Sequence, residues 1–329
     1  MFGSSGPLRD RHNRRIEYVR VSITEQCNYR CVFCMPREDN LPPAKRPRLA
    51  TDETLRLCGV LSRLGVGKFK ITGGEPFMNP DALAILAGLK NNRAVKSVTV
   101  TTNASALGRH ADALADIGVD GVNISLNAIT PETYARVTRS AVDVDRILDN
   151  ILLAADRGLA VKLNMVPIRG INDVDIIPVL DFALDHGMPV RFIELMPLGE
   201  GMRFSGLSHE EVRGIVEKRF GPTTPAAERQ GNGPAVYFTV AGHSARIGYI
   251  TALTDNFCNR CNRIRLTSAG FLKTCLHHKH GGDLAASLRN GADDDALANR
   301  IRKIVADKPE RHDMEHCPAG GEPMHRIGG

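Results

Sequence analysis

The sequence predicts an α/β protein built on one curved parallel sheet covered by helices, with a smaller C-terminal appendage. Three observations support this fold class. The chain has 329 residues, well beyond a typical single domain. Between residues 17 and 200, short runs rich in Val and Ile alternate six times with segments of helical periodicity, as in repeated βα units. After residue 200 the pattern changes to short alternating strands.

Most of the six predicted strands are too apolar to have a solvated face, which favours parallel strands covered by helices. Right-handed crossovers would then coil the units into one sheet with helices outside. An open doubly wound sheet gives a similar pattern and is the alternative. The predicted strands are residues 17–23, 68–72, 97–102, 121–126, 160–167 and 189–196.

Start and stop signals delimit the helices between these strands. Capping side chains are expected at Thr51, at Asn79 before a proline, and at Thr130 before a proline. Gly65 stands near the end of the first helix, and glycines after apolar helical stretches fit left-handed C-terminal caps at Gly118, Gly158 and Gly187.

The region after residue 200 reads as a small antiparallel appendage. Ser208 and Glu211 predict a capping box for a helix that ends near Phe220. Short strands follow at 235–240, 245–250 and 263–267, with a turn into 271–275, and a last helix is expected at 293–307. We expect three parts: a flexible N-terminal segment (1–16), the α/β unit (17–205) and a C-terminal region (206–329).

Composition excludes several classes of protein. The net charge of +6 suits phosphorylated ligands but is too small and spread out for a nucleic-acid binder. With no tryptophan and 5% aromatic residues, a stacking platform for single strands is not expected. No apolar stretch is long enough to span a membrane, and the first residues lack the apolar middle of a signal peptide, so we expect a cytoplasmic protein.

Six of the eight cysteines fall in two groups, and the first follows the first predicted strand. Cys27, Cys31 and Cys34 form C-x3-C-x2-C. Three thiolates in one short loop can hold three corners of a cubane iron–sulfur cluster and leave one iron open for substrate chemistry. A structural zinc site, the alternative, requires a fourth ligand, but the closest histidines, His12 and His110, are distant in the sequence.

With Phe33 before its last cysteine, this loop resembles that of the radical S-adenosylmethionine (radical SAM) superfamily. The predicted strand 68–72 also ends in the superfamily's second signature, GGEP, whose glycines allow close backbone approach and whose exposed polar groups can receive an ammonium. The resemblance implies a partial (βα)6 barrel of the TIM type. It also implies a [4Fe–4S] cluster whose open iron binds S-adenosyl-L-methionine and splits it reductively into methionine and a 5′-deoxyadenosyl radical.

The second group is Cys258, Cys261 and Cys275, with the last two at either end of a predicted hairpin. A second cluster with three ligands fits this spacing. A zinc site completed by a nearby histidine or by Cys317 stays open. Arg263 and Arg265 alternate along the following strand and share one face, which suits an anionic substrate beside the metal.

With these residues the resemblance narrows to the GTP 3′,8-cyclases of molybdenum cofactor biosynthesis, through the segments SITEQCNYRCVFCMP, ITGGEP, TTN, NISL, VKLN, RFIELMPLGEG, FCNRCNRIRL and the terminal IGG. It implies a second [4Fe–4S] cluster that binds the guanine base, removal of the 3′ hydrogen of GTP, and ring closure onto C8. Implied partners are an external electron donor such as flavodoxin or ferredoxin and a companion cyclic pyranopterin monophosphate synthase. Nucleic acid and membranes are not expected, and a homodimer is left open.

The resemblance also assigns site residues by position. Expected contacts to S-adenosylmethionine are Phe33, Gly74, Ser125 and Met196. Expected contacts to GTP are Arg20, Lys70, Thr101, Lys162, Arg263 and Arg265. Arg191 either serves the same pocket or makes a structural ion pair, and Gly328 and Gly329 are expected to enter the barrel and support catalysis.

Two positions depart from the family pattern. Lys70 stands where the family usually has arginine, which keeps the charge but loses the bidentate fork. Ala104 replaces the glycine of a TTNG turn, which puts the turn geometry in question. Cys58 falls on an apolar helix face and is expected in the core, and Cys317 has no assigned role.

Other functions compete with this reading. The nearest enzymatic alternative is a two-cluster radical SAM enzyme that modifies a peptide. A ferredoxin-like electron carrier or a zinc-stabilised binding protein is the alternative from another class.

Overall fold

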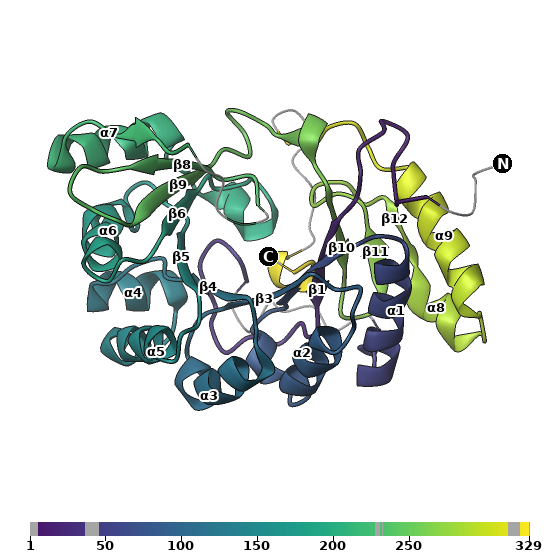
Figure 1. Cartoon of the computed structure of the whole chain (residues 1–329). Coiled ribbons are helices and arrows are strands. Elements are labelled where there is room, and N and C mark those ends of the chain that lie inside the picture. Colours follow the sequence, from purple (N-terminus) through teal and green to yellow (C-terminus); the bar gives the residue numbers. More distant parts are fainter. Residues whose placement is uncertain (1–5, 37–45, 228–230, 232, 315–322, 329) are drawn as a thin grey trace.

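A computed structural model describes residues 6–36, 46–227, 231, 233–314 and 323–328. Its strands form one twelve-stranded sheet in the order β12-β11-β10-β1-β2-β3-β4-β5-β6-β9-β8-β7. The eight strands from β10 to β9 are all parallel and curve into an open barrel, with the helices around the outside (Figure 1). The predicted fold class is confirmed.

All six predicted βα units are present. The strands β2 and β3 have the expected bounds, and the bounds of the other four differ by one to three residues. The strands are β1 (Tyr18–Ser22), β2 (Lys68–Thr72), β3 (Ser97–Thr102), β4 (Gly121–Ser125), β5 (Val161–Met165) and β6 (Val190–Ile193). The helices are α1 (Thr51–Arg63), α2 (Ala82–Lys90), α3 (Leu107–Ile117), α4 (Pro131–Thr138), α5 (Val144–Asp156) and α6 (Ile176–Asp185).

The C-terminal strands do not form a separate sheet. The hairpin of β8 and β9 adds β9 to β6, whereas β10 pairs with β1 at the other end of the barrel and continues into β11 and β12. Both pairings to the barrel are parallel and distant in sequence, so the local pattern could not reveal them. The elements are α7 (His209–Phe220), β7 (Thr224–Pro225), β8 (Val236–Thr239), β9 (Arg246–Ile250), β10 (Arg263–Leu266), β11 (Phe271–Lys273), β12 (Gly281–Asp283), α8 (Leu284–Arg289) and α9 (Asp294–Ala306).

The barrel strands have two different faces, and here the sequence interpretation was wrong. Along β3, buried and half-buried residues alternate strictly. Residues such as Val98 and Val100 pack in the core against the helices, whereas the other phase is polar. The strands are therefore apolar on one face only, and their polar face points into the barrel.

Residues 6–16 differ from the flexible segment that we expected. Leu8 and Ile16 are buried in the core, and the buried side chains of Asp10 and Arg14 form an ion pair of 2.6 Å. Residues 1–5 lie outside the described part of the chain. Apolar anchors at both ends of the segment hold it against the barrel.

The capping box of α7 and the left-handed glycine caps are confirmed, but the three predicted capping side chains are not. Thr130 is the N-cap residue of α4, yet its hydroxyl donates to the Asp175 carboxylate and makes no capping bond. Helix α1 has Ala50 as its N-cap, and the Glu53 carboxylate accepts the Ala50 N–H at 2.8 Å. Helix α2 has Asp81, not Asn79, as its N-cap. The Asn79 side chain instead accepts from the Asp81 N–H and donates to the Ile23 carbonyl. That second bond ties the loop after β2 to the end of β1.

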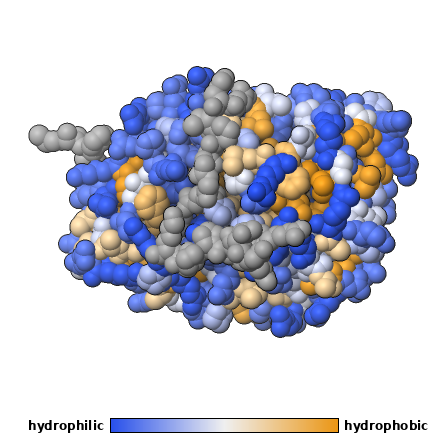
Figure 2. Space-filling model, turned by 180° about the vertical axis from the view of Figure 1, so that it is seen from behind, coloured by the Kyte–Doolittle hydropathy of each residue, from blue (hydrophilic) through white to orange (hydrophobic). Residues whose placement is uncertain are grey.

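The outer surface is mainly hydrophilic, with hydrophobic residues in scattered groups on the face seen in Figure 2. Within the described residues, no helix combines the length and the apolar character that a bilayer crossing requires.

Cys58 gives a test of the packing. It is fully buried on α1, and burial raises the pKa of its thiol to about 12. We expect Cys58→Ser to lower the free energy of unfolding by about 1–3 kcal/mol, because a hydroxyl costs more to bury in the apolar core than a thiol. Cys58→Ala is the matched control, with a smaller loss of about 1 kcal/mol. Urea unfolding compares the two, and equal stability of the serine variant and the parent would contradict this packing.

Candidate functional site

The residues expected at the first cluster lie at the carboxyl ends of the parallel strands. Gly74 follows β2, Ser125 ends β4 and Met196 follows β6. A side chain at Gly201 would touch the carbonyl oxygens of both Met196 and Phe33, at 2.6 and 3.6 Å, so the loop after β6 packs on the cysteine loop. The fold thus brings the four expected S-adenosylmethionine contacts to one edge of the barrel.

The GGEP turn packs on the backbone just before the first cysteine. The Gly74 N–H donates to the Thr24 carbonyl at 2.9 Å, and the Glu75 N–H donates to the Gln26 carbonyl at 2.8 Å. A Cβ at Gly74 would lie 2.2 Å from the Gln26 carbonyl oxygen, which no rearrangement of a side chain could relieve. The glycine is therefore required for contact between two loops of this chain, besides any ligand contact.

Glu75, the third residue of the GGEP turn, is buried. Its carboxylate accepts from the Thr102 hydroxyl and from the Asn103 N–H, both at 2.7 Å. Burial raises its pKa to about 7, against the effect of these bonds. Glu75 therefore joins the end of β2 to the end of β3.

The turn after β3 keeps its geometry although alanine replaces glycine. Ala104 adopts φ 64° and is fully buried. Left-handed backbone costs a residue other than glycine about 1–2 kcal/mol, so bonds around the turn must hold it. The Ala104 N–H donates to the Thr102 hydroxyl at 3.1 Å, and the Asn150 amide donates to the Ala104 carbonyl at 3.0 Å.

The first cysteine loop is fixed, and its thiols disfavour ionisation. Burial raises the pKa of Cys27 to about 11 and that of Cys34 to about 12, and it raises the pKa of Cys31 as well. The neighbouring cysteines add to the effect on Cys31 and Cys34. Three half-buried thiols that repel one another as thiolates fit a cationic iron–sulfur centre, which stabilises the charged form.

The second group, Cys258, Cys261 and Cys275, has a different electrostatic setting. Burial alone would raise the pKa of Cys261, but the charges of Lys308 and Arg263 lower it to about 7. Among the described residues, no three His, Cys, Asp or Glu side chains stand close enough to ligate a single metal ion. A cubane cluster offers each thiolate its own iron, so its ligands stand further apart.

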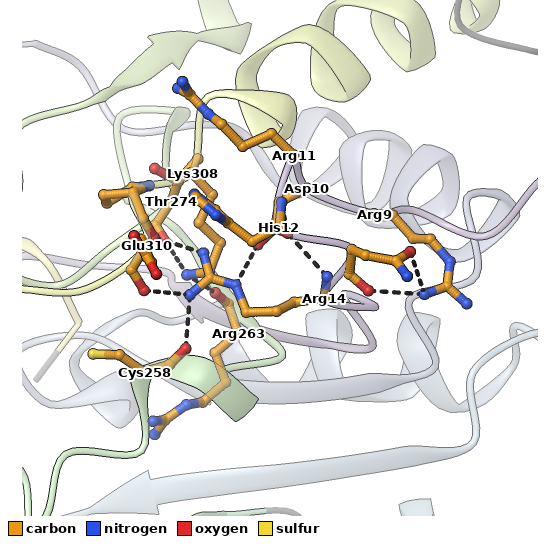
Figure 3. A network of polar contacts seen from close by, with 12 residues as sticks. Arg9, Asp10, Arg11, His12, Arg14, Cys258, Arg263, Thr274, Lys308 and Glu310 are labelled. Atoms are coloured by element: carbon orange, nitrogen blue, oxygen red, sulfur yellow. Dashed lines mark hydrogen bonds and ion pairs between the residues drawn. The ribbon is translucent and has the colours of Figure 1, made fainter.

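Two buried cations hold the backbone around this second group (Figure 3). Arg14 Nη1 donates to the carbonyls of Cys258 and Glu310, at 2.7 and 2.6 Å. Lys308 Nζ donates to the Arg263 carbonyl at 3.0 Å and to the Thr274 carbonyl. The N-terminal segment and the end of α9 therefore position the second cysteine group, a role that the sequence reading missed.

The polar inner face of the barrel is strongly cationic. Arg20 pairs in register with Lys70 on one side and Arg265 on the other. Burial lowers the pKa of Lys70 well below 10.5, and the charges of Arg191, Arg20, Lys162 and Arg263 lower it further. Thr101 lies on the same face, two residues beyond the partner of Lys70 on β3. The barrel thus brings all the expected GTP contacts together.

Arg191 belongs to this cationic face. Its Nε donates to the Asn164 side chain at 2.8 Å and its Nη2 to the Asn123 side chain. No carboxylate is found among the partners that the described residues give it. Of the two expectations, the pocket role fits and the ion pair is wrong. Asn123 and Asn164 were missed in the sequence, where alternation with apolar neighbours in NISL and VKLN was the available signal.

The C-terminal tail lies inside the barrel mouth, where Figure 1 shows the chain end beside β1. Arg265 Nη1 donates to the carbonyls of Ile327 and Gly328. A side chain at Gly328 would lie 3.0 Å from Thr72 and 3.4 Å from Ser22. The expected entry of the tail is confirmed for Gly328, whereas Gly329 and Cys317 lie outside the described residues.

An open parallel barrel with a three-cysteine loop after its first strand defines a radical SAM protein. Residues 21–183 match the Radical SAM superfamily, and residues 188–314 match the family Molybdenum Cofactor Synthesis C. The chain belongs to the family of the GTP 3′,8-cyclases. It is 33% identical to the GTP 3′,8-cyclase of Clostridium perfringens over 98% of this chain and 100% of that protein, and 37% identical to that of Rhizobium etli over 98% and 94%.

Solved structures agree on the fold. SuiB of Streptococcus suis bound to S-adenosylmethionine superposes with a TM-score of 0.65, covering 93% of this chain and 67% of SuiB at 14% identity. At that identity the likeness concerns the fold alone. The domain limits expected from the sequence stay a prediction.

Arg14 and Arg9 form a matched pair for testing the anchor of the second cysteine group. Arg14→Ala removes the charged partner of the buried Asp10 carboxylate and the donor of several carbonyls, so we expect a loss of about 3–5 kcal/mol in the free energy of unfolding. Exposed Arg9, which bonds Asn13, should tolerate Arg9→Ala within about 0.5 kcal/mol.

The second readout is the alkylation rate of Cys258 in metal-free protein. It should rise in Arg14→Ala and stay at the parent value in Arg9→Ala. Unchanged stability and unchanged alkylation in Arg14→Ala would show that the anchor has no such role.

Proposed function

We propose that this protein is a GTP 3′,8-cyclase that acts in the first step of molybdenum cofactor biosynthesis. It converts GTP to 3′,8-cyclo-7,8-dihydro-GTP. The observation that carries the proposal is the cationic inner face of the barrel, which lies between two cysteine groups and suits a triphosphate. Near full-length relatives of that name, at 33 to 38% identity, support it.

The first cysteine group would hold a [4Fe–4S] cluster through Cys27, Cys31 and Cys34. When bound, the cluster and S-adenosylmethionine supply a 5′-deoxyadenosyl radical. The chain's own contribution is placement: Phe33, Gly74, Ser125 and Met196 lie around the cofactor position at the barrel mouth. The tail with Gly328 and Gly329 would close that mouth and exclude water.

The second cysteine group would hold a [4Fe–4S] cluster through Cys258, Cys261 and Cys275, with guanine as its ligand. Arg20, Lys70, Lys162, Arg191, Arg263 and Arg265 would bind the triphosphate and fix the ribose toward the first cluster, with Thr101 beside them. The main contribution of such a barrel to catalysis would be to hold GTP and the S-adenosylmethionine-derived radical in one fixed orientation.

Partners follow from the chemistry. The reaction consumes electrons that GTP does not provide, so an external donor of the flavodoxin or ferredoxin kind is required. The product would pass to a companion cyclic pyranopterin monophosphate synthase. The cytoplasm and the oligomeric state stay predictions from the sequence.

The deciding experiment is anaerobic incubation of the reconstituted, reduced protein with S-adenosylmethionine and GTP. We expect 5′-deoxyadenosine and cyclised GTP together, and about eight irons per chain. If 5′-deoxyadenosine forms without GTP consumption, the substrate is wrong. Zinc without iron would overturn the enzyme class, and GTP left intact while a peptide is modified would favour the peptide-modifying alternative.

Lys70 should make GTP binding depend on pH. The pKa of its free ammonium lies well below 10.5 because of burial and neighbouring cations, and a bound triphosphate would raise that pKa. Binding therefore takes up a proton, and affinity should fall as pH rises from neutrality toward the ordinary lysine value of about 10.4.

Lys70→Arg is the matched control, because guanidinium stays charged over this range. Calorimetric Kd values for GTP in the parent and the variant, taken at the same pH values, cancel the titration of the phosphate itself. We expect the ratio of the two Kd values to change at least threefold across the range. A constant ratio would mean that Lys70 keeps its proton throughout.

Removal of the last two residues should uncouple the formation of 5′-deoxyadenosine from the cyclisation of GTP. Arg265 loses the Gly328 carbonyl, and the barrel mouth loses its cover. We expect cyclisation to fall at least tenfold, while GTP-independent formation of 5′-deoxyadenosine continues. Chromatography of both products checks this, with a two-residue C-terminal extension as control. Undiminished cyclisation after truncation would refute a role for the tail.

A further inference from the structure

A groove runs along the solvent side of the first cysteine loop. The loop and the end of α4 form its two sides, and Phe204 completes it. Asn28 and Arg30 stand between the ligands Cys27 and Cys31 in the sequence, so this groove borders the expected cluster directly. The lining residues are Asn28, Arg30, Val32, Ala135, Arg136, Arg139 and Phe204.

Backbone hydrogen bonds join the two sides of the groove. The Arg30 N–H donates to the Thr138 carbonyl and the Val32 N–H to the Val137 carbonyl, both at 2.9 Å. Beneath them the hydroxyls of buried Tyr29 and Tyr134 are 2.9 Å apart and hydrogen-bonded. The groove therefore has a fixed position relative to the cysteines, and what binds there is held next to the loop.

The groove is positively charged. Arg30 donates to the Cys27 and Tyr29 carbonyls, at 2.6 and 3.0 Å, and Arg136 donates to the Ile171 carbonyl at 2.9 Å. The carbonyl acceptor of Arg136 carries no net charge, so this guanidinium keeps its own. Arg136 and Arg139 are exposed, and the described lining contains no Asp or Glu.

This charge reaches the cysteines. Arg139 directly follows α4, whose Val137 and Thr138 carbonyls accept from the N–H groups on either side of Cys31, and it lines the groove together with Asn28. In the proposed function, the cationic inner face of the barrel is occupied by the substrate. A negatively charged partner that must come close to the first cluster therefore meets this groove from the solvent side.

We propose that the groove is the docking site of an acidic one-electron carrier protein. The inference rests on the proposed function, because that reaction needs an electron from outside the chain. In the docked complex the carrier is oxidised by one electron and the first cluster is reduced by one electron, with no bond made or broken. Long-range attraction between opposite charges would speed this encounter and make it sensitive to salt.

The test compares two double variants of the holoenzyme with equal change in charge. Arg136→Glu with Arg139→Glu reverses the groove. Arg93→Glu with Lys303→Glu reverses two exposed cations elsewhere, after α2 and on α9. Each is assayed with dithionite, a small reductant that needs no docking site, and with reduced flavodoxin as the acidic carrier.

We expect both variants to keep dithionite-driven cyclisation within twofold of the parent. With flavodoxin, kcat/KM for the carrier should fall at least tenfold in the groove variant and less than twofold in the control. The difference should shrink as salt is raised from low to physiological strength and above, since screening removes the attraction. Equal losses in the two variants, or no loss in either, would overturn the docking site.

A groove variant that loses iron or dithionite-driven activity is replaced by Arg136→Gln with Arg139→Gln. This pair removes the positive charge of the groove without adding negative charge. With flavodoxin, kcat/KM for the carrier should then fall at least threefold in this variant and less than twofold in the control. A parent that cyclises no GTP with dithionite refutes the proposed function instead, so the two failures are distinguishable.

Discussion

The mutual repulsion of buried cations inside the barrel is the constraint on which the rest of the structure depends. Lys70 and Arg20 lie side by side on neighbouring strands, and the charges of Arg191 and Arg263 act on both. Such an arrangement costs free energy in the empty protein. The apolar outer face of the same strands, packed against the helices, must supply the stability that the inner face lacks. A bound polyanion relieves the repulsion, so ligand binding and stability are coupled.

Neutral dipoles hold the cations without cancelling their charge. Arg191 is oriented by the side chains of Asn123 and Asn164, and Arg265 by backbone carbonyls of the C-terminal tail. A carboxylate in these places would neutralise the pocket and compete with a triphosphate for the same guanidinium groups. Outside the barrel, Lys308 likewise donates to carbonyls around the second cysteine group, whereas Arg14 there is also paired with the Asp10 carboxylate. Positioning and charge are thus kept separate inside the barrel.

Features that depend on residues close together in the chain could be predicted from the sequence, whereas contacts between distant residues could not. The six units, the capping box at Ser208 and both cysteine groups depend on residues close together in the chain, and they were predictable. The parallel pairing of β10 with β1 and the anchoring of Cys258 by Arg14 join residues more than 200 positions apart, and no local pattern records them. The polar inner face could have been predicted from the alternation of polar and apolar residues along β3 to β5. It was overlooked because the strands contain many apolar residues.

The two cysteine groups lie in opposite electrostatic surroundings, and this separates their tasks. Burial and neighbouring thiols raise the pKa of the first group, whereas Lys308 and Arg263 lower that of Cys261 in the second. A centre among cations can hold an anionic substrate beside it, as we propose for the second group. A centre with less compensating charge, bordered by solvent on one side and the barrel mouth on the other, suits the passage of an electron. In the proposed function, the electron and the nucleotide would therefore approach from different directions and meet at the barrel mouth.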